Sequence, residues 1–409
     1  MTSDRFVDTP SFSREELAEQ ADVDQAFVDR LIEMGAFGNG DGRQSFGPMD
    51  VRRVRLLHAW EDAGLRAEGI MDLVRKGELS VAWLNTPVMT RAKRLETTFR
   101  DLCRELDVPQ RLVEAVYEAI GFAPPSPSDG VREGDRELVD LVNTFLGAGA
   151  DEGPTLRLLR VYADSLRRIA QAEAELYEVQ IEERLRHAGQ DERQLLEFGA
   201  RFGDQVIGFL EHAITDIYRR HREHIWIEHS INHAEIAMER AGLFEKVERP
   251  PAICFVDLTG YTRLTEEQGD EAAARLATSL ASLVEDTSRR HGGRPIRWLG
   301  DGGMFHFKVP GHAVLAGLDM VEAAPDAGLP PMHIGIHTGP VIFQDGDVYG
   351  LTVNLASRIA SHATAGQVMT STETMQRSDL ARIRFAPVEP VSLKGVAQPV
   401  TLYQAFRAD

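Results

Sequence analysis

The chain has 409 residues, a length that suggests two or three domains rather than one compact core. Hydrophobic residues make up 43% of it and charged residues 27%, which is typical of a folded soluble protein. The formal net charge is −19 at pH 7. This acidic excess argues against general binding to nucleic acid or to an anionic membrane, because both need a basic surface.

Two absences narrow the class of protein further. No apolar run approaches the length of a membrane span, and the N-terminal residues MTSDRFVDTP lack the apolar core of a signal peptide. The only cysteines, Cys103 and Cys254, lie far apart in apolar settings, so we expect neither a disulfide framework nor a zinc knuckle. The sequence therefore predicts a cytoplasmic protein without a membrane span.

Residues 11–123 are expected to form short helices, with a turn-rich cluster, GNGDGRQSFGP, between Gly38 and Pro48. The runs FSREELAEQADVDQAFVDRLIEMGAF and FGPMDVRRVRLLHAWEDAGLRAEGI resemble the winged helix-turn-helix of MerR-type regulators, which implies DNA binding. From Ser11 to Ser80, however, there are 9 Lys and Arg against 14 Asp and Glu, and an acidic module binds phosphates poorly. We therefore favour a degenerate helical module that has been reused for regulation.

A faint internal repeat links this zone to the next. The run AFVDRLIEMGAF, from Ala26, resembles RLVEAVYEAIGF, from Arg111. Each is followed by a turn-rich gap and then by a charged and apolar helix, DVRRVRLLHAW in one case and DRELVDLVNTF in the other. Two copies of one helical module would explain the similarity, although unrelated amphipathic helices also produce such patterns.

Residues 124–248 are predicted to be almost entirely helical, with a long stretch rich in Leu, Ala, Glu and Arg. Because imidazoles titrate near physiological pH, histidines gathered on the last helix could form a pH sensor, or they could be ordinary surface residues. His229 and His233 have a spacing that suits zinc, but no third ligand is evident nearby. The last helix, from about His212 to Phe244, carries five histidines: His212, His221, His224, His229 and His233.

Residues 250–409 have a different pattern, because Pro250 and Pro251 end the helix and the apolar run Ala252–Val256 opens a mixed α/β zone. In ICFVDLTGYTRL, a predicted strand ends in Asp257 and a helix begins directly afterwards. In RWLGDGGMFHF, Asp301 lies in a glycine-rich turn between two predicted strands. Two carboxylates brought together would suit Mg²⁺, which prefers oxygen ligands and bridges to phosphates.

Two further stretches carry polar residues at suggestive positions. In GDVYGLTVNLASRIA, Asn354 and Arg358 are four residues apart, so on a helix they share one face. In VSLKGVAQPVTLY, the loop of a predicted strand–turn–strand presents Lys394. Taken singly, each of these features is also common in capped strands, solvated helix faces and charged turns.

Taken together and in this order, the four stretches resemble the class III nucleotidyl cyclase (adenylate and guanylate cyclase) domain, from about Pro250 to Ala408. The resemblance implies an α+β, ferredoxin-like βαββαβ core that works as a head-to-tail homodimer. The whole chain would then be a multidomain protein in which a mainly α-helical regulatory region precedes the catalytic domain. That architecture is similar to the autoregulated adenylate cyclases of actinobacterial, mycobacterial type, one of which responds to acid.

The resemblance also implies a role for each quoted residue. The catalytic pair, Asn354 and Arg358, would position the ribose and stabilise the transition state, on the protomer opposite the metal ligands. Two Mg²⁺ or Mn²⁺ ions per active site would bind at Asp257, Asp301 and Leu258. Contacts to the nucleoside triphosphate would come from the following residues: Thr259, Gly260, Tyr261 and Thr262 after the first strand, Lys394 at the triphosphate, and Asp347 and Arg297 at the base.

Arg297 departs from the pattern of the family. Adenylate cyclases of this class usually pair Lys with Asp at the base, and guanylate cyclases pair Glu with a small polar residue. The pair here is Arg297 and Asp347, so ATP is the favoured substrate but GTP and the pyrimidine nucleotides stay open. Arg297 could instead form a salt bridge and read no base. A rival from another class is a transcription regulator whose cyclase domain is catalytically silent.

Overall fold

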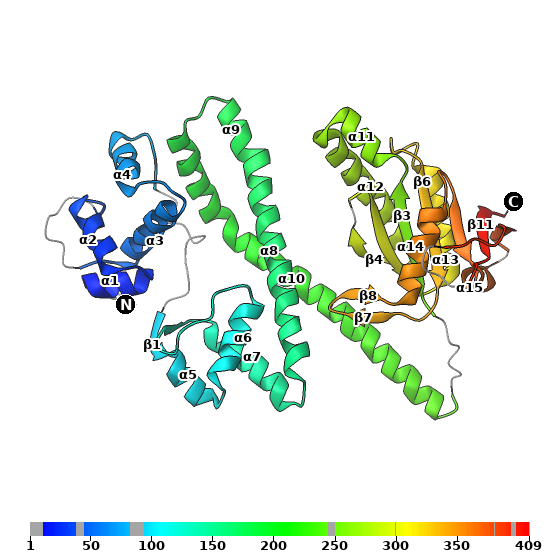
Figure 1. Cartoon of the computed structure of the whole chain (residues 1–409), viewed down its shortest axis with the longest axis horizontal. Helices are drawn as coiled ribbons and strands as arrows, with labels where there is room; N and C mark the ends of the chain where they lie inside the picture. Colours follow the sequence, from blue (N-terminus) through cyan, green and yellow to red (C-terminus); the bar gives the residue numbers. More distant parts are fainter. Residues whose placement is uncertain are drawn as a thin grey trace, which may run out of the picture. The chain divides into compact units, whose positions relative to one another are not determined.

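The computed structural model describes residues 11–37, 45–81, 94–243, 250–298, 300–379, 381–393 and 398–408. Four side chains in these ranges lie outside the description, those of Arg94, Glu96, Thr262 and Asp270. The chain forms two compact units, Met1–Ala234 and Glu235–Asp409, which are described separately (Figure 1). Within the described residues, no helix combines the length and the apolar character that a membrane span needs.

The N-terminal unit begins with a four-helix module. Phe12 and Phe46 form an antiparallel bridge, so the segments before the first helix and before the third lie side by side. Buried Leu17, Val28 and Val54 belong to one apolar core that the helices share. The module contains α1 (Arg14–Ala21), α2 (Gln25–Glu33), α3 (Pro48–Asp62) and α4 (Ala67–Lys76).

A second module follows the same plan: an extended segment, two helices, a second extended segment that pairs with the first, and a further helix. Its first and fourth elements pair as antiparallel strands, and its core contains buried Leu102, Val113 and Val139. The elements are β1 (Arg94–Thr98), α5 (Phe99–Leu106), α6 (Gln110–Ala119), β2 (Gly130–Arg132) and α7 (Asp135–Gly147). The domain boundary expected at residue 123 falls between α6 and β2, and therefore inside this module.

The two modules are structural copies of each other at a constant offset of 85 residues. Each copy opens its first helix with a capping box, ends that helix with a left-handed aspartate, and starts its third helix with a carboxylate that accepts a main-chain N–H. The equivalent residues are Ser13 and Thr98, Asp22 and Asp107, and Asp50 and Asp135. The sequence repeat therefore reflects a repeated fold, because local hydrogen bonds recur with the same spacing as the apolar core.

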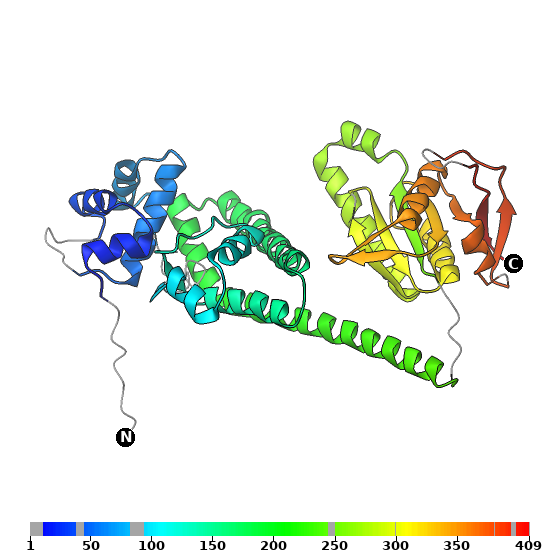
Figure 2. The same ribbon diagram turned by 60° about the horizontal axis from the view of Figure 1, so that its bottom comes forward.

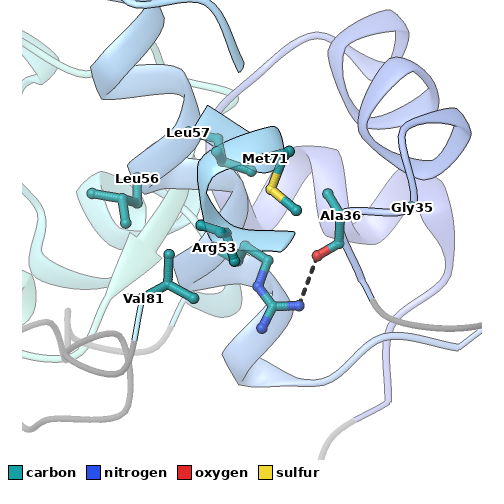
Figure 3. A pocket seen from close by; sticks show the side chains of 8 residues that line it. Gly35, Ala36, Arg53, Leu56, Leu57, Met71 and Val81 are labelled. Atoms are coloured by element: carbon teal, nitrogen blue, oxygen red, sulfur yellow. Dashed lines mark hydrogen bonds between the residues drawn. The ribbon is translucent and has the colours of Figure 1, made fainter. Parts of the chain in front are cut away.

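A pocket of about 200 Å³ lies in the first copy between α3, α4 and the segment after α2 (Figure 3). Apolar side chains such as Leu57 and Met71 form its walls. Arg53 also lines it, and its Nη1 donates a hydrogen bond to the carbonyl of Ala36 at 2.8 Å. Because this guanidinium already bonds to the main chain, the pocket is best described as a gap in the apolar packing.

Long helices complete the N-terminal unit. They are α8 (Glu152–Tyr177), the π-helical segment η3 (Glu178–Glu182), α9 (Glu183–His187) and α10 (Glu192–Arg240), which continues into the second unit. The long α10 is the extended green helix in Figure 2. Many large apolar side chains on it are exposed: Phe209, Ile217, Tyr218, Ile225, Trp226, Ile227, Ile231 and Met238. A single surface helix rarely exposes this much apolar surface unless another surface covers it.

The C-terminal unit is built on a seven-stranded sheet with the order β10-β11-β9-β6-β3-β5-β4. All neighbouring strands are antiparallel except β6 and β9, which are parallel. A separate hairpin joins β7 (Ile342–Gln344) to β8 (Asp347–Tyr349). The strands of the sheet are β3 (Ala252–Leu258), β4 (Gly293–Trp298), β5 (Gly302–Phe307), β6 (Met332–Thr338), β9 (Val368–Ser371), β10 (Ile383–Pro387) and β11 (Leu402–Arg407).

The predicted βαββαβ core is confirmed. In chain order it runs β3, α12, β4, β5, α13 and β6, and in the sheet these strands lie in the ferredoxin-like order β6-β3-β5-β4. Apolar residues of α12 and α13 pack on one face of the sheet, and α14 packs on the other. The helices are α11 (Tyr261–Gln268), α12 (Asp270–Arg290), α13 (Pro310–Ala323), α14 (Leu351–His362) and α15 (Thr372–Gln376).

Gly335 of β6 allows α14 to lie directly on the sheet. A Cβ atom at this position would stand 2.0 Å from the amide nitrogen of Ala360 and 2.7 Å from the carbonyl oxygen of Ala356. No side chain fits in that space, so this glycine is required by the close approach of helix and strand. The contact also fixes the rotation of α14, because the alanines must face the sheet.

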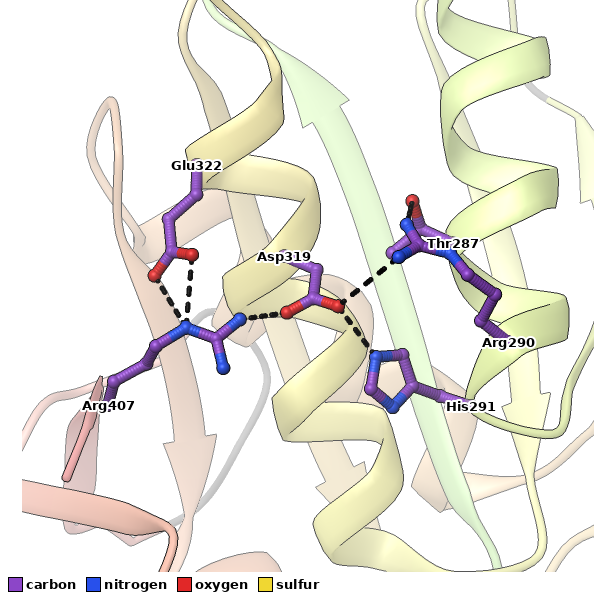
Figure 4. A network of polar contacts seen from close by, with 6 residues as sticks. All are labelled: Thr287, Arg290, His291, Asp319, Glu322 and Arg407. Atoms are coloured by element: carbon purple, nitrogen blue, oxygen red, sulfur yellow. Dashed lines mark hydrogen bonds and ion pairs between the residues drawn. The ribbon is translucent and has the colours of Figure 1, made fainter.

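A polar network on the other face ties the end of the chain to α12 and α13 (Figure 4). Asp319 accepts hydrogen bonds from Arg407 of β11 and from His291, whose Nε2 lies 2.8 Å away, and Arg407 Nε also bonds Glu322 at 2.9 Å. Burial acts to raise the pKa of Asp319, but His291 and Arg407 outweigh it and hold the pKa below its ordinary value. The network therefore links β11 to α13 and to the end of α12, and it lies on the face of the sheet opposite α14.

Candidate active site

The two predicted metal-binding aspartates lie next to each other at one end of the sheet. Asp257 is near the end of β3 and pairs in register with Gly302 of β5, while Asp301 precedes that glycine. The amide of Leu258 donates to the carbonyl of Asp301 at 3.0 Å, which pins the turn onto the end of β3. A Cβ at Gly302 would stand 2.3 Å from the carbonyl oxygen of Val256, so only glycine fits beside the first carboxylate.

The electrostatics of this pair favour a bound cation. Burial raises the pKa of Asp301, and the nearby charge of Asp257 raises it further. A divalent ion beside the two carboxylates would relieve this repulsion. Within the described ranges no three side chains of His, Cys, Asp or Glu form a metal cluster, so main-chain oxygens, water and phosphates would have to complete the coordination.

His333 completes this end of the sheet, and we did not predict it from the sequence. It lies on β6 opposite Asp257, with Nε2 at 3.3 Å from Oδ2 of that carboxylate. Its Nδ1 lies 3.2 Å from the hydroxyl of Thr259. No local pattern in the sequence indicates these contacts, because they depend on the register between strands that are far apart in the chain.

The turn after β3 leads into the N-terminus of α11, where we expect contacts to phosphate. Gly260 has φ of +78°, a conformation that glycine adopts without strain, and it allows the chain to turn into the helix. The hydroxyl of Tyr261 donates to the carbonyl of Ala273 at 3.1 Å and its ring packs on the core. Any contact of this residue to substrate would therefore come from its main chain, and the side chain of Thr262 lies outside the described structure.

Asn354 and Arg358 lie on the face of α14 that points away from the sheet. Ala356 faces Gly335, and a residue two positions away on an α-helix is rotated by about 200°. Nη1 of Arg358 is buried, yet it has no hydrogen-bond partner within the described part of the chain. A buried guanidinium donor without an acceptor is costly, and an anionic ligand would satisfy it.

The helix α14 begins beyond the far end of β6 and runs back along this strand toward the aspartate end. His333, at the start of β6, is level with Asp257, whereas Thr352, in the first turn of α14, donates to the carbonyl of Pro340 beyond the end of β6 at 2.6 Å. From there α14 passes over Gly335, which abuts Ala356 and Ala360, so Arg358 is about level with Gly335, two strand residues or about 7 Å along the sheet from Asp257. Asp257 lies on the sheet, however, and Asn354 and Arg358 point away from it, so within one chain α14 directs them away from the carboxylates.

The predicted base-reading residues contact each other. Arg297, on β4, forms a hydrogen-bonded ion pair with Asp347, at the start of β8. Burial acts to raise the pKa of Asp347, but the bonds from Arg297 and from the Val348 amide outweigh it and lower the pKa. The bond to Asp347 in turn raises the pKa of Arg297. Arg297 therefore forms a salt bridge with Asp347 in this structure.

The remaining predicted residues lie on α10 or outside the described residues. Lys394 falls outside the described residues, so its role stays a prediction. All the histidines of the proposed sensor lie exposed on α10; Nε2 of His229 lies 3.0 Å from Nε2 of His233, and Nε2 of His224 lies 3.6 Å from a carboxylate oxygen of Glu228. Neither arrangement includes a third metal ligand within the described ranges.

Comparison with known proteins supports the same interpretation of the C-terminal unit. The family model for the adenylate and guanylate cyclase catalytic domain matches residues 245–405. An adenylate cyclase of Streptomyces coelicolor is 28% identical over 331 residues, which cover 80% of this chain and 82% of that protein. A pH-sensitive adenylate cyclase of Mycobacterium tuberculosis is 24% identical over 319 residues, 75% of this chain and 77% of that one.

Among solved structures, the adenylyl cyclase CyaB of P. aeruginosa aligns with 41% of this chain and 98% of its own, at 25% identity and a TM-score of 0.37. The family match covers β3, which carries Asp257, the turn before β5, which carries Asp301, and α14, which carries Asn354 and Arg358. Residues 245–405 therefore form the catalytic domain of a class III nucleotidyl cyclase, and in this chain a helical N-terminal region precedes it.

Proposed function

We propose that this protein is an adenylate cyclase that converts ATP to 3′,5′-cyclic AMP and pyrophosphate at sites shared between two copies of the chain. One observation carries the proposal: the paired carboxylates lie on the sheet, whereas the unpartnered donor of Arg358 lies on the face of α14 that points away from the sheet. The first group suits divalent cations, and the second suits the phosphoryl group that reacts. The names of the relatives in Streptomyces and Mycobacterium support ATP as the substrate.

In the proposed reaction, the 3′-oxygen of the ribose attacks the α-phosphorus in line. A new P–O bond forms, the bond to the β-phosphate oxygen breaks, pyrophosphate leaves, and the 3′-hydroxyl loses its proton. Arg358 would bind the phosphoryl oxygens, where negative charge grows in the transition state, and Asn354 would orient the ribose. Two Mg²⁺ or Mn²⁺ ions held by Asp257 and Asp301 would neutralise the triphosphate and lower the pKa of the 3′-hydroxyl.

A head-to-tail homodimer would bring the two groups together. The outward face of α14 would then meet the aspartate end of the other copy, and two-fold symmetry would create two equal sites. Exposed apolar side chains beside α14 support such an interface, because isolated patches of this kind usually mark contact surfaces: Ile342, Phe343, Tyr349 and Leu351. The exposed apolar residues of α10 offer a second surface for the same dimer.

The base preference rests on the pair of Arg297 and Asp347. Asp347 can accept a hydrogen bond from the amino group of adenine, and it has no proton to offer the carbonyl of guanine. Because Arg297 already occupies this carboxylate, GTP and the pyrimidine nucleotides are the alternative substrates.

The deciding experiment is an assay of the purified protein with ATP, GTP, CTP and UTP, each with Mg²⁺ and with Mn²⁺. We expect cyclic AMP to be the main product, identified by mass. Faster turnover of GTP or UTP would refute the choice of ATP. If no cyclic nucleotide forms at all but the protein binds a specific DNA sequence tightly, the silent transcription regulator would be the better description.

The charge of the helical modules argues against that outcome. The second module, residues 94–147, has 6 Lys and Arg against 11 Asp and Glu, so it is as acidic as the first.

We further propose that the helical region inhibits the catalytic domain in a pH-dependent way. The five histidines lie exposed on α10, and imidazole is the side chain whose ordinary pKa lies nearest physiological pH. Removing the residues before Glu245 should raise the maximal rate and flatten the pH profile. An unchanged maximal rate would remove the inhibition, and an identical pH profile would remove the sensor.

A further inference from the structure

The contact between His333 and Asp257 suggests a function for a residue outside the predicted site. The imidazole is largely buried, with 16% of the side chain exposed, and it lies on the same face of the sheet as the carboxylate. A side chain that is held in place by its neighbours can fix the orientation of the group that it touches.

Both nitrogens of the ring have partners that agree with one neutral tautomer. With the proton on Nε2, this nitrogen donates to Oδ2 of Asp257 at 3.3 Å, while Nδ1 accepts from the hydroxyl of Thr259 at 3.2 Å. The two contacts leave the ring little freedom to rotate, because each one fixes a different edge. The ring therefore links the carboxylate to the turn that leads into α11.

We propose that His333 is a positioning residue that holds Asp257 in the orientation required for metal binding. The inference rests on the metal role proposed above for Asp257. Carboxylates that bind metals usually need such a hydrogen bond, and its loss typically weakens metal affinity or activity by about 10- to 100-fold. The imidazole acts through the carboxylate, since Mg²⁺ prefers oxygen ligands and Nε2 is already directed at Asp257.

Two conservative substitutions separate the two contacts of the ring. In His333→Gln the side-chain amide nitrogen stands near the place of Nε2, so the bond to Asp257 can remain. In His333→Asn the amide stands near the place of Nδ1, so only the contact to Thr259 can remain. His333→Leu removes both. His337→Leu is the matched control, because this histidine lies on the same strand and face, is 12% exposed, and contacts Ser371 instead.

The measurement is direct binding of Mn²⁺ to the full-length protein, followed by the loss of the free-ion EPR signal. A non-reactive ATP analogue, with a methylene group between the α- and β-phosphorus, is present at saturation, and its own binding of Mn²⁺ is subtracted. We expect His333→Leu and His333→Asn to weaken the affinity about tenfold and His333→Gln to stay within about threefold of the wild type. The Mn²⁺ concentration for half-maximal activity should rise in parallel, while kcat at saturating Mn²⁺ stays within about threefold.

The outcomes distinguish this inference from the proposed function. If Asp257→Asn abolishes Mn²⁺ binding but all three variants of His333 bind as tightly as the wild type, the positioning role is refuted and the metal site stands. If Asp257→Asn binds Mn²⁺ normally, the metal site itself is refuted. Equal losses in the Gln and Asn variants, or a loss in His337→Leu of the same size, would show a general effect on folding and would also overturn the proposal.

Discussion

The two halves of the candidate active site are positioned in different ways. At the aspartate end, main-chain hydrogen bonds and strand register place the carboxylates, and Asp257 already has a partner in His333. On α14, the rotation of the helix alone places Asn354 and Arg358, and the buried Nη1 of Arg358 has no partner within the described residues. One half has an excess of negative charge and the other has an unsatisfied cation.

This difference shows what each half lacks. Carboxylates that repel each other need positive charge, and a buried guanidinium needs an acceptor. A nucleoside triphosphate with divalent cations offers both, but within one chain α14 directs Asn354 and Arg358 away from the sheet that carries the aspartates. The comparison therefore favours a site that is assembled from two copies.

The largest expected effect comes from inactivating each half in a separate protein. Arg358→Ala should lower kcat by about 10²- to 10³-fold, because it removes a charged donor to the transition state. Asp257→Ala should abolish metal-dependent activity. When the two inactive proteins are mixed at equal amounts and allowed to exchange subunits, half of the dimers contain one intact site, so activity should return to at most about a quarter of the wild-type rate.

The control for this experiment is a mixture of two variants from the same half. Asp257→Ala mixed with Asp301→Ala leaves every dimer without an intact aspartate pair, and activity should not return. Failure of the first mixture, although mass spectrometry shows that heterodimers have formed, would mean that each chain carries a complete site.

An intermediate effect is expected at the predicted base-reading pair, Arg297 and Asp347, which lie in the same chain and contact each other. Arg297→Lys should loosen the ion pair and free Asp347 to bind the adenine amino group. One additional hydrogen bond to a charged group should raise the ratio of kcat/KM for ATP to that for GTP by about 10- to 100-fold. Asp347→Asn should lower the same ratio, because its amide can donate to the carbonyl of guanine.

The pH dependence of this ratio gives a second measurement. The pKa of Asp347 is lowered and that of Arg297 is raised, so the stabilisation from the pair is lost only as the pH falls through the lowered pKa of the carboxyl. Between about pH 5 and 9 the pair stays ionised, and the nucleotide ratio should be constant. A ratio that changes across this range, or that falls in Arg297→Lys, would contradict a base-reading role for the pair.

Local patterns in the sequence predicted the parts of the site that depend on local structure. A strand that ends in Asp257, a glycine turn around Asp301, and the helical spacing of Asn354 and Arg358 could all be recognised without a fold. The repeat of the N-terminal modules could also be recognised, because caps and core residues recur at one spacing. The roles of these site residues stay predictions until they are tested.

Contacts that depend on strand pairing could not be predicted in the same way. His333 reaches Asp257 only because β6 lies next to β3 in one register, and a shift by one residue would point its ring to the other face. The pairing of Arg297 with Asp347 depends similarly on the hairpin β7–β8 lying near β4. The sequence resemblance indicated that Arg297 and Asp347 lie near the base. It left open whether Arg297 contacts the base or forms a salt bridge.

The smallest expected effect concerns stability rather than activity. Because the pKa of Asp301 is raised, the folded protein binds this proton more tightly than the unfolded chain does. Its contribution to stability is therefore present at acidic pH and is lost as the pH rises through the raised pKa. At pH 7.5 the ionised carboxylate opposes folding in the metal-free protein. Asp301→Asn should then raise the midpoint of thermal unfolding by about 1–3 °C, and the difference should shrink toward pH 4.

The order of the two unfolding midpoints, that of the wild type and that of Asp301→Asn, should reverse when metal and nucleotide are bound. With Mn²⁺ and the methylene analogue of ATP, the wild type should gain stability from binding, whereas Asp301→Asn should gain little. Asp326→Asn, at an exposed carboxylate in the same unit, is the control and should change neither midpoint by more than a degree. A lower midpoint for metal-free Asp301→Asn would show that this carboxylate stabilises the turn by itself. In that case the repulsion between the two aspartates would no longer explain why this end of the sheet suits a divalent ion.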